Sequence, residues 1–314
     1  MLNRHVLLFA ALTWAGLAHA QHASLPSGMR FVRAHEANAH GGFDVDAVTV
    51  DLCDGSLAPR VSAPTEGART VSAWARDVNA LAAVNGDYFD GRSMQPLGPA
   101  RGAGHDWSAP RREHRDTLFA FDHDAQPHLL DAPDTAQPTV WLDANARLDA
   151  AWPDVIAVRE RVLRDGVVRE SPAIVHDGER HPRTALGLSA DRHTLFLAVV
   201  DGRAEHSSGA TTDELARAML HLGARDAFKL DGGGSSTLFV RGRGVVNHPS
   251  DGHERFVANH IGIVATAGPA TRRAWCGAAP SHASHRGLPA SAYLVLMGTV
   301  AVAMRTSARR SRRS

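Results

Sequence analysis

Three consecutive glycines, Gly232 to Gly234, constrain this chain more than any other feature, because they lie between two apolar runs. Glycine loses more backbone freedom on ordering than other residues do, so three in a row weaken a helix or a strand. The run therefore predicts a loop whose backbone N–H groups approach a ligand in an anion-binding nest. Asp231 precedes the glycines, and Ser235 and Ser236 follow with hydroxyl groups. A plain hairpin needs only one or two glycines, so this combination favours a phosphate or sugar site.

The rest of the chain body is rich in short strand-like runs bounded by Gly, Asp or Pro. A helix is predicted over Thr211–Leu222, capped by Thr211 or Thr212 and ended by Gly223. A weaker helical pattern covers 70–79. The pattern predicts an α+β fold with mixed β-sheets and a few packed helices. The predicted strands are 43–52, 81–84, 117–121, 155–158, 184–189, 194–200, 227–230, 237–240 and 260–266.

The first twenty residues have the layout of a secretory signal peptide. A short basic start is followed by an apolar run over 6–18, and Ala18-His19-Ala20 supplies a small-x-small cleavage site. The apolar run is too short to span a membrane easily. We therefore expect an exported protein, periplasmic or at the cell surface, whose single catalytic domain covers 21–267.

The C-terminal end predicts a membrane segment. Residues 268–287 are rich in Ala, Pro, Ser and His and are predicted to be a linker, and 288–304 carry no charge. The tail over 305–314 is rich in arginine, which fits a cytoplasmic end under the positive-inside rule. A buried terminal helix is the alternative. The layout also resembles bacterial sorting tails, so the segment is either a permanent anchor or the target of a sorting protease.

Charge and cysteine content narrow the function classes. The formal net charge is +1, and without the tail arginines the remainder is acidic, so no nucleic-acid partner is expected. Cys53 and Cys276 are the only cysteines and are compatible with one disulfide in an oxidising compartment. Cys276 lies next to the predicted linker, so the sequence leaves their pairing open.

Polar clusters follow or precede several of the predicted strands, where a rigid sheet can position them. In chain order they are Asn85-Gly86-Asp87-Tyr88-Phe89, Pro182-Arg183-Thr184-Ala185, Asp201-Gly202-Arg203, Leu230-Asp231-Gly232-Gly233-Gly234-Ser235-Ser236 and the segment from Asn247 to Asn259. This ordered set, from about Val48 to Val264, resembles the phosphodiester glycosidase family. An animal member of that family removes N-acetylglucosamine from mannose-6-phosphate tags.

The resemblance implies cleavage of a sugar from a phosphodiester at the anomeric carbon. The phosphate is an anionic leaving group that needs little protonation, so the site must hold phosphate and stabilise an oxocarbenium-like carbon. Arg183 can clamp phosphate oxygens through its planar fork. The candidate catalytic carboxylates are Asp231, Asp87 and Asp201, with Asp231 favoured because the glycines let a substrate approach it. The predicted substrate-binding residues are Asn85, Gly86, Arg183, Thr184, Lys229, Gly232, Gly233, Gly234, Ser235, Ser236 and Arg255.

Several of these residues have a structural alternative. Lys229 is the only lysine, and it is expected either to join the phosphate site or to pair with Asp231. Asn85 can simply shape its loop, and Asp201 can belong to an ordinary hairpin turn. Arg255 can bind substrate or pair with a nearby acidic residue. No metal-ligand spacing such as H-E-x-x-H is present, so no catalytic metal and no cofactor are predicted, although three Asp near one site leave room for a structural cation.

The leading prediction is a hydrolase that acts on glycosyl-1-phosphodiesters of envelope glycans or exopolysaccharide. One alternative is an ordinary glycosidase on peptidoglycan or exopolysaccharide, for which Arg183 would matter less than Asp231. The other is a non-catalytic glycan-binding envelope protein.

Overall fold

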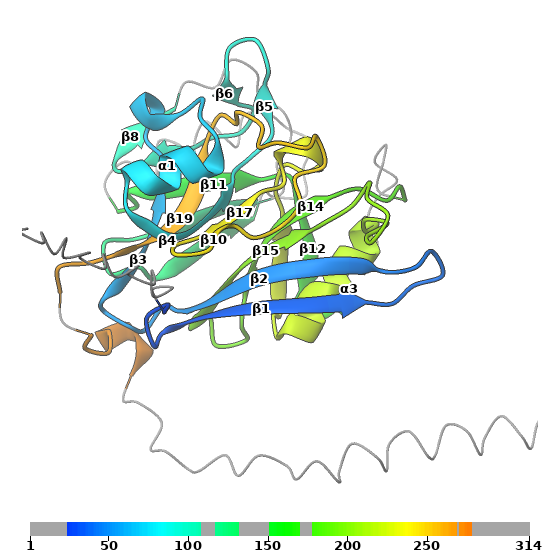
Figure 1. The fold of residues 1–314 in the computed structure, drawn as a ribbon. Helices are drawn as coiled ribbons and strands as arrows, with labels where there is room; N and C mark the ends of the chain where they lie inside the picture. Colours follow the sequence, from blue (N-terminus) through cyan, green and yellow to red (C-terminus); the bar gives the residue numbers. More distant parts are fainter. Residues whose placement is uncertain (1–23, 108–116, 132–150, 170–177, 269, 278–314) are drawn as a thin grey trace, which may run out of the picture. The chain divides into compact units, whose positions relative to one another are not determined.

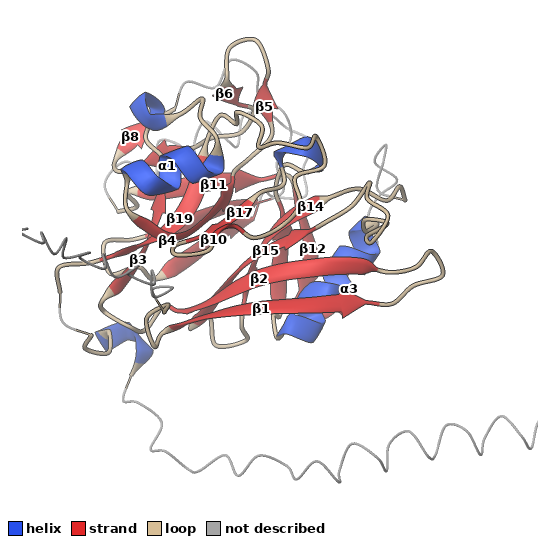
Figure 2. Ribbon diagram, in the orientation of Figure 1, coloured by secondary structure: helices blue, strands red, loops and turns tan. Residues whose placement is uncertain are grey.

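The computed structural model describes residues 24–107, 117–131, 151–169, 178–268 and 270–277. Strands predominate in this part of the chain, with few helices (Figures 1 and 2). The predicted signal peptide, the apolar segment 288–304 and the basic tail lie outside the described residues. Among the residues that are described, no helix is both long enough and apolar enough to cross a bilayer.

The largest sheet has seven strands and carries much of the core. In spatial order they are β1 (Met29–Glu36), β2 (Phe43–Asp51), β15 (Thr194–Val200), β14 (Arg183–Leu188), β16 (Asp226–Lys229), β12 (Glu160–Arg164) and β13 (Val167–Val168). Every strand pair in the described chain is antiparallel. The α+β prediction is confirmed in outline, with little helix. The sheets were expected to be mixed, but they are antiparallel in the described chain.

Two five-stranded sheets and a short ribbon complete the β-structure. One sheet is β10 (Pro127–Asp131), β9 (Thr117–Phe121), β11 (Asp154–Val158), β7 (Arg101–Gly102) and β8 (His105–Asp106). The other is β18 (Gly244–Val245), β17 (Leu238–Val240), β4 (Ala80–Asn85), β19 (His260–Ala265) and β3 (Leu57–Val61). The ribbon pairs β5 (Phe89–Asp90) with β6 (Gln95–Pro96).

The central core joins all three large sheets, because alternate residues of each strand face inward. One buried cluster contains Val48, Leu186, Leu197 and Phe228 of the seven-stranded sheet together with Val84, Phe119, Ile156, Leu238 and Ile261 of the five-stranded sheets. Intervening residues of the same strands face the helices. Ala185 and Ala198 pack with the helix α3 (Thr212–Leu222), while Ala83 packs with Trp74 of α1 (Val71–Asp77).

Both predicted helices are confirmed. Thr211 caps α3 and forms a capping box with Glu214, and Gly223 ends the helix with a left-handed φ of 105°, a conformation that favours glycine. Thr70 caps α1 by accepting a hydrogen bond from the Ala73 N–H. The predicted strands are also present to within one or two residues at each end.

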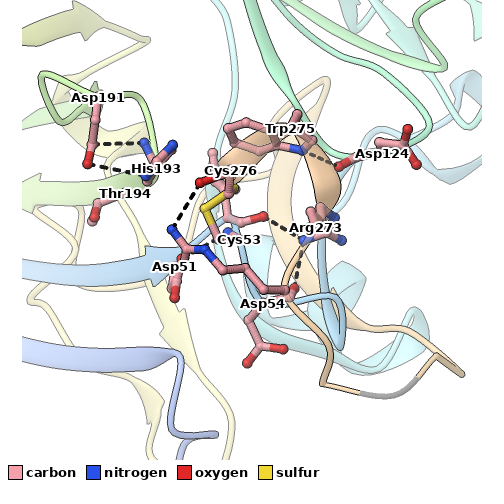
Figure 3. Close-up of a disulfide and its surroundings, with 12 residues drawn as sticks. Asp51, Cys53, Asp54, Asp124, Asp191, His193, Thr194, Arg273, Trp275 and Cys276 are labelled. Atoms are coloured by element: carbon pink, nitrogen blue, oxygen red, sulfur yellow. Dashed lines mark hydrogen bonds and ion pairs between the residues drawn. A yellow bond between two sulfur atoms is a disulfide. The ribbon is translucent and has the colours of Figure 1, made fainter. Parts of the chain in front are cut away.

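Cys53 and Cys276 form a disulfide, with 5.8 Å between their Cα atoms (Figure 3). The segment before Cys276 packs against the body of the protein, since the Arg273 guanidinium donates to the carbonyls of Leu52 and Asp54, each at 2.6 Å. The Trp275 indole N–H donates to the Asp124 carbonyl. Residues 270–276 are therefore part of the folded unit that ends at Cys276, and the prediction that the linker begins at 268 is wrong for this stretch.

Candidate active site

The ends of four strands bring the predicted polar segments together. In the antiparallel order β15-β14-β16, the start of β14 lies beside the ends of its two neighbours, so Arg183 meets the loops that follow Val200 and Lys229. Asn85, the last residue of β4, reaches the same place from the sheet packed opposite. The fold thus assembles one site from segments that are far apart in the sequence.

Asn85 connects three of these segments, and its side chain is fully buried. Its Nδ2 donates to the Asp231 carbonyl at 2.8 Å. Its Oδ1 accepts from the Thr184 hydroxyl at 2.8 Å and from the Thr237 N–H at 3.2 Å. Since every polar atom of the amide is used within the protein, Asn85 and Thr184 position the glycine loop.

The glycine loop packs tightly against its surroundings. The Asp231 N–H donates to the Gly86 carbonyl at 3.1 Å, and the Gly233 N–H donates to the Pro182 carbonyl at 2.9 Å. A Cβ on Gly234 would lie 2.1 Å from Oδ2 of Asp251, and one on Gly86 would lie 2.2 Å from Oδ1 of Asn259. These glycines therefore permit close packing of the loops around the site.

The nest interpretation of this loop is wrong in its simple form, because most of the N–H groups are already engaged. The Gly232 N–H donates to Oδ1 of Asp231 at 2.9 Å. The Ser235 and Ser236 N–H groups donate to the Gly232 and Gly233 carbonyls of a 3₁₀ turn, η2 (Gly233–Ser235). Bonds inside the turn replace the row of N–H donors that a nest would offer to an anion.

Hydroxyl groups remain available where the N–H groups do not. Five buried polar atoms around the loop have no hydrogen-bond partner in the described part of the protein: Ser235 Oγ, Ser236 Oγ, Thr237 Oγ1, Ser250 Oγ and Asn259 Nδ2. A buried polar group without a partner costs about 1–3 kcal/mol, so such a group is usually satisfied by a ligand or by water. Because Ser235 and Ser236 belong to the glycine loop that follows Asp231, these atoms favour a polar ligand at this place.

Asp231 is half-buried and titrates unusually. Burial is the largest effect and raises the pKa of its carboxyl from 3.8 to about 6. The Ser235 hydroxyl and the Gly232 N–H lower the pKa, Asp87 raises it and Arg255 lowers it. The Ser235 hydroxyl therefore lies next to the Asp231 carboxylate. A carboxyl with a pKa near the working pH is suited to acid–base catalysis.

Asp231→Asn is expected to stabilise the folded protein above pH 6. The folded pKa lies above the unfolded value, so the folded chain holds this proton more tightly, and wild-type stability falls as pH rises from about 4 to about 6. Asparagine does not titrate, so the gain is roughly 1–3 kcal/mol at pH 7 and disappears below pH 4. Urea unfolding of both proteins at pH 4 and pH 7 measures it; an equal difference at both pH values would contradict the prediction.

The structure places the other two candidate carboxylates in supporting positions. The Asp87 carboxylate accepts from the N–H groups of Tyr88 at 2.7 Å and Gly98 at 3.0 Å. Asp201 accepts from the His248 N–H at 2.9 Å and from the Asn247 amide at 3.1 Å. Both are almost fully buried. These contacts fix the loops on either side of Asp231.

The two predicted substrate-binding arginines lie in different environments. Arg183 is buried, and its guanidinium donates to the carbonyls of Ala210 and Glu179 at 3.0 and 2.9 Å. Those two hydrogen bonds hold the planar guanidinium of Arg183 in one orientation. The side chain lies beside Gly232, since a Cβ added to Gly232 would be 3.9 Å from Arg183 Cδ. Arg255 is exposed and donates to Asp251 at 2.6 Å, yet it is close enough to lower the pKa of Asp231.

Lys229 lies elsewhere than expected. Its ammonium is 2.6 Å from the Glu160 carboxylate, and both side chains are buried. It also donates to the Thr212 hydroxyl at 3.2 Å. Glu160 is opposite Lys229 in the pairing of β12 with β16. Both expectations for Lys229, a place in the phosphate site and pairing with Asp231, are therefore wrong. The side chain points to the α3 face of the sheet, where Ala227 of the same strand packs.

Two residues that the sequence did not single out, Tyr88 and Arg159, also lie at the site. Burial and the negative charge of Asp231 raise the pKa of Tyr88 to about 12, so its phenol stays protonated. The Arg159 guanidinium lies 4.9 Å from the centre of the Tyr88 ring, within cation–π range. Tyr88 stands in the Asn85–Phe89 segment and could have been found there, whereas no sequence signal marks Arg159.

Comparisons with known proteins show the family and the fold of this chain. A family model described as phosphodiester glycosidase matches residues 78–264. The catalytic domain of zebrafish N-acetylglucosamine-1-phosphodiester alpha-N-acetylglucosaminidase, auto-inhibited by its pro-peptide, has a similar fold, with a TM-score of 0.60 and 19% identity over 76% of this chain and 83% of that one. The family match spans more than half of this sequence, so the chain belongs to the phosphodiester glycosidase family.

Two further solved structures have a similar fold, and one bacterial protein is similar in sequence over a short stretch. A hypothetical protein from Synechocystis gives a TM-score of 0.56 with 15% identity over 76% of this chain and 62% of that one. A protein of Burkholderia pseudomallei K96243, described as exported, gives 0.54 with 18% identity over 71% and 74%. The SPbeta prophage-derived uncharacterized protein YomE of Bacillus subtilis (strain 168) is 44% identical over 84 residues. That alignment covers 27% of this chain and 13% of the relative.

Proposed function

We propose that this protein hydrolyses a glycosyl-1-phosphodiester of the N-acetylglucosamine-phosphate type and releases the sugar. The observation that carries the proposal is Asp231, a carboxyl with a pKa of about 6 set among buried hydroxyls without partners. Membership in the family supports the reaction class, and the zebrafish relative is named for this type of linkage.

In the proposed reaction the Asp231 carboxylate activates a water molecule. The water oxygen bonds to the anomeric carbon while the bond from that carbon to the phosphate oxygen breaks. The electron pair leaves with the phosphate, and the water proton passes to Asp231. A single central carboxylate suffices because the phosphate leaves as an anion without prior protonation, and the carboxylates of Asp87 and Asp201 are held by N–H donors.

Positive charge near the leaving group would stabilise the phosphate as its charge develops. Arg183 is oriented by two backbone carbonyls, and Arg255 lies over the glycine loop. We assign phosphate recognition to these two residues and sugar recognition to the hydroxyls of Ser235, Ser236 and Thr237. Hydroxyls exchange hydrogen bonds with sugars in both directions, since each donates and accepts.

The proposed cellular setting is the envelope, with capsule, wall polymer or exopolysaccharide as the substrate. Export is supported by the signal-like N-terminus, by a structural neighbour whose name describes it as exported and by the disulfide, which is typical of oxidising compartments. The proposal of a C-terminal membrane anchor rests on the uncharged sequence of 288–304.

Arg183→Ala is expected to lower kcat/KM on an N-acetylglucosamine-1-phosphodiester by about 10- to 100-fold, the value of a charge-assisted hydrogen bond. The loss on an aryl N-acetylglucosaminide without phosphate is expected to be smaller. Sugar release by the purified full chain measures both. Arg183→Lys tests the planar fork at constant charge. Arg217→Ala is the matched control, since Arg217 pairs with Asp213 on the exposed surface of α3.

Equal losses on the two substrates would contradict phosphate recognition by Arg183 and would favour an ordinary glycosidase. Absence of release from both substrates by the folded wild type would reject this substrate class. Thermal unfolding of each variant shows whether a loss of activity reflects a loss of fold.

A further inference from the structure

Three residues outside the proposed reaction converge beside the glycine loop. Asp201 follows β15, His206 lies in the turn just after it, and His248 lies in the segment after β18. One ligand atom from each lies within 4.8 Å of the others. The Asp201 Oδ2 to His248 Nδ1 distance is 3.1 Å, and the rings of His206 and His248 are 4.7 Å apart between centroids.

We propose that Asp201, His206 and His248 bind a divalent transition-metal ion, with Zn²⁺ as the best match. Two imidazoles and one carboxylate are a ligand set that Zn²⁺ accepts, with bonds of about 2.0–2.2 Å. Tetrahedral ligand atoms then lie about 3.3 Å apart, close to the observed Asp201–His248 distance. His206 is exposed, and metal binding requires a side-chain rotation that brings its nitrogen to the same separation.

The surroundings hold the ligands in place. The buried Asp201 carboxylate is oriented by N–H donors from Asn247 and His248. The Ser207 hydroxyl donates to the Asp201 carbonyl at 2.7 Å, which fixes the turn that carries His206. Metal-ligating carboxylates typically have such supporting hydrogen bonds. The three protein ligands leave a coordination position for water.

A metal at this place would join two segments that border the glycine loop. Asn247 donates to the Asp201 carboxylate and also to the Ser236 carbonyl, each at 3.1 Å. An ion bound by Asp201, His206 and His248 therefore fastens the 201–207 turn to the segment that positions Ser236. We assign it a stabilising role, because none of its ligands is needed for the proposed reaction except through loop position.

A simple hydrogen bond between Asp201 and His248 is the competing explanation. In that case His206 has no part, since the structure gives its ring no hydrogen bond among the described residues, only the contact with His248. His206 is thus the residue that discriminates between the two.

The test uses the untagged full chain, stripped with chelator and titrated with Zn²⁺ and with Co²⁺. Calorimetry should show one tight site per chain, Zn²⁺ should raise the thermal midpoint, and Co²⁺ should give visible d–d absorption of a low-coordinate site. His206→Gln and His248→Gln should each weaken Zn²⁺ affinity by at least about tenfold and abolish the Co²⁺ signal. His253→Gln is the matched control, an exposed histidine of the same segment.

Affinity unchanged by His206→Gln would overturn the proposal, as would the absence of saturable Zn²⁺ binding to the stripped protein. Neither readout depends on sugar release, so failure of the metal site is distinguishable from failure of the proposed activity.

Discussion

Asp231→Asn is expected to lower kcat for sugar release by roughly 10²–10⁴-fold, the usual contribution of a general base. Asparagine has nearly the same shape and can still accept from the Gly232 N–H, but it cannot take a proton from water. Since Asp231 is expected to act in its ionised form, wild-type kcat should rise with pH through the carboxyl pKa of about 6. Initial rates on an N-acetylglucosamine-1-phosphodiester from pH 4.5 to 8 measure both effects.

The matched control is Asp213→Asn, which removes an exposed carboxylate on α3 and should leave kcat and the pH profile unchanged. The structural carboxylates give a second comparison. Asp87→Asn is expected to lower thermal stability together with activity, because the Asp87 carboxylate holds two N–H groups of its loop. An Asp231→Asn enzyme that keeps more than a tenth of wild-type kcat would sink the assignment of the base.

The location of the site could be predicted from the sequence because strand ends and turn residues are local features. Each polar segment can be recognised in the sequence by itself. It contains glycines where loops pack closely, or it has a carboxylate or an arginine at the end of an apolar run. The antiparallel order of β15, β14 and β16 then brings segments that share a strand end into one place. Asp231, Arg183 and Thr184 are found together for this reason, whereas Asn85 reaches the same place from β4 of another sheet.

The roles within the site could not be predicted, because they depend on contacts across long sequence distances. Asp87 and Asp201 look like Asp231 in the sequence, yet in the fold their carboxylates accept hydrogen bonds from Gly98, Asn247 and His248, which are distant in the sequence. Lys229 pairs with Glu160, a residue of a strand that the sequence pattern did not predict. Whether the Ser235 and Ser236 hydroxyls face a ligand likewise depends on the conformation of the glycine loop. The glycines allow several conformations, so the sequence does not specify which one forms.

The disulfide could be proposed but not settled from composition, since Cys276 follows a segment with linker-like residues. The two cysteines meet because the Arg273 guanidinium donates to the carbonyls of Leu52 and Asp54, on either side of Cys53. These bonds hold the segment that carries Cys276 next to Cys53. The same contacts explain why the folded unit extends to Cys276.

Replacing both cysteines with alanine is expected to lower the free energy of unfolding by about 2–5 kcal/mol. The bridge joins residues 223 positions apart, so its loss frees a very long loop in the unfolded chain. Both cysteines are also buried, and alanine leaves part of their volume unfilled. Urea unfolding of wild type, Cys53→Ala/Cys276→Ala and reduced wild type measures the effect, and the two modified proteins should lose similar stability.

Activity should not follow stability in this variant. Cys53 comes after the end of β2, which pairs with the start of β15 through Asp51 and Thr194, whereas Asp201 follows the other end of β15. The seven residues of β15 place roughly 20 Å of strand between the bridge and the site. At temperatures well below its midpoint, the double variant should keep wild-type kcat and the wild-type pH profile. If kcat falls in step with stability, the site depends on the C-terminal segment through contacts that this geometry does not contain.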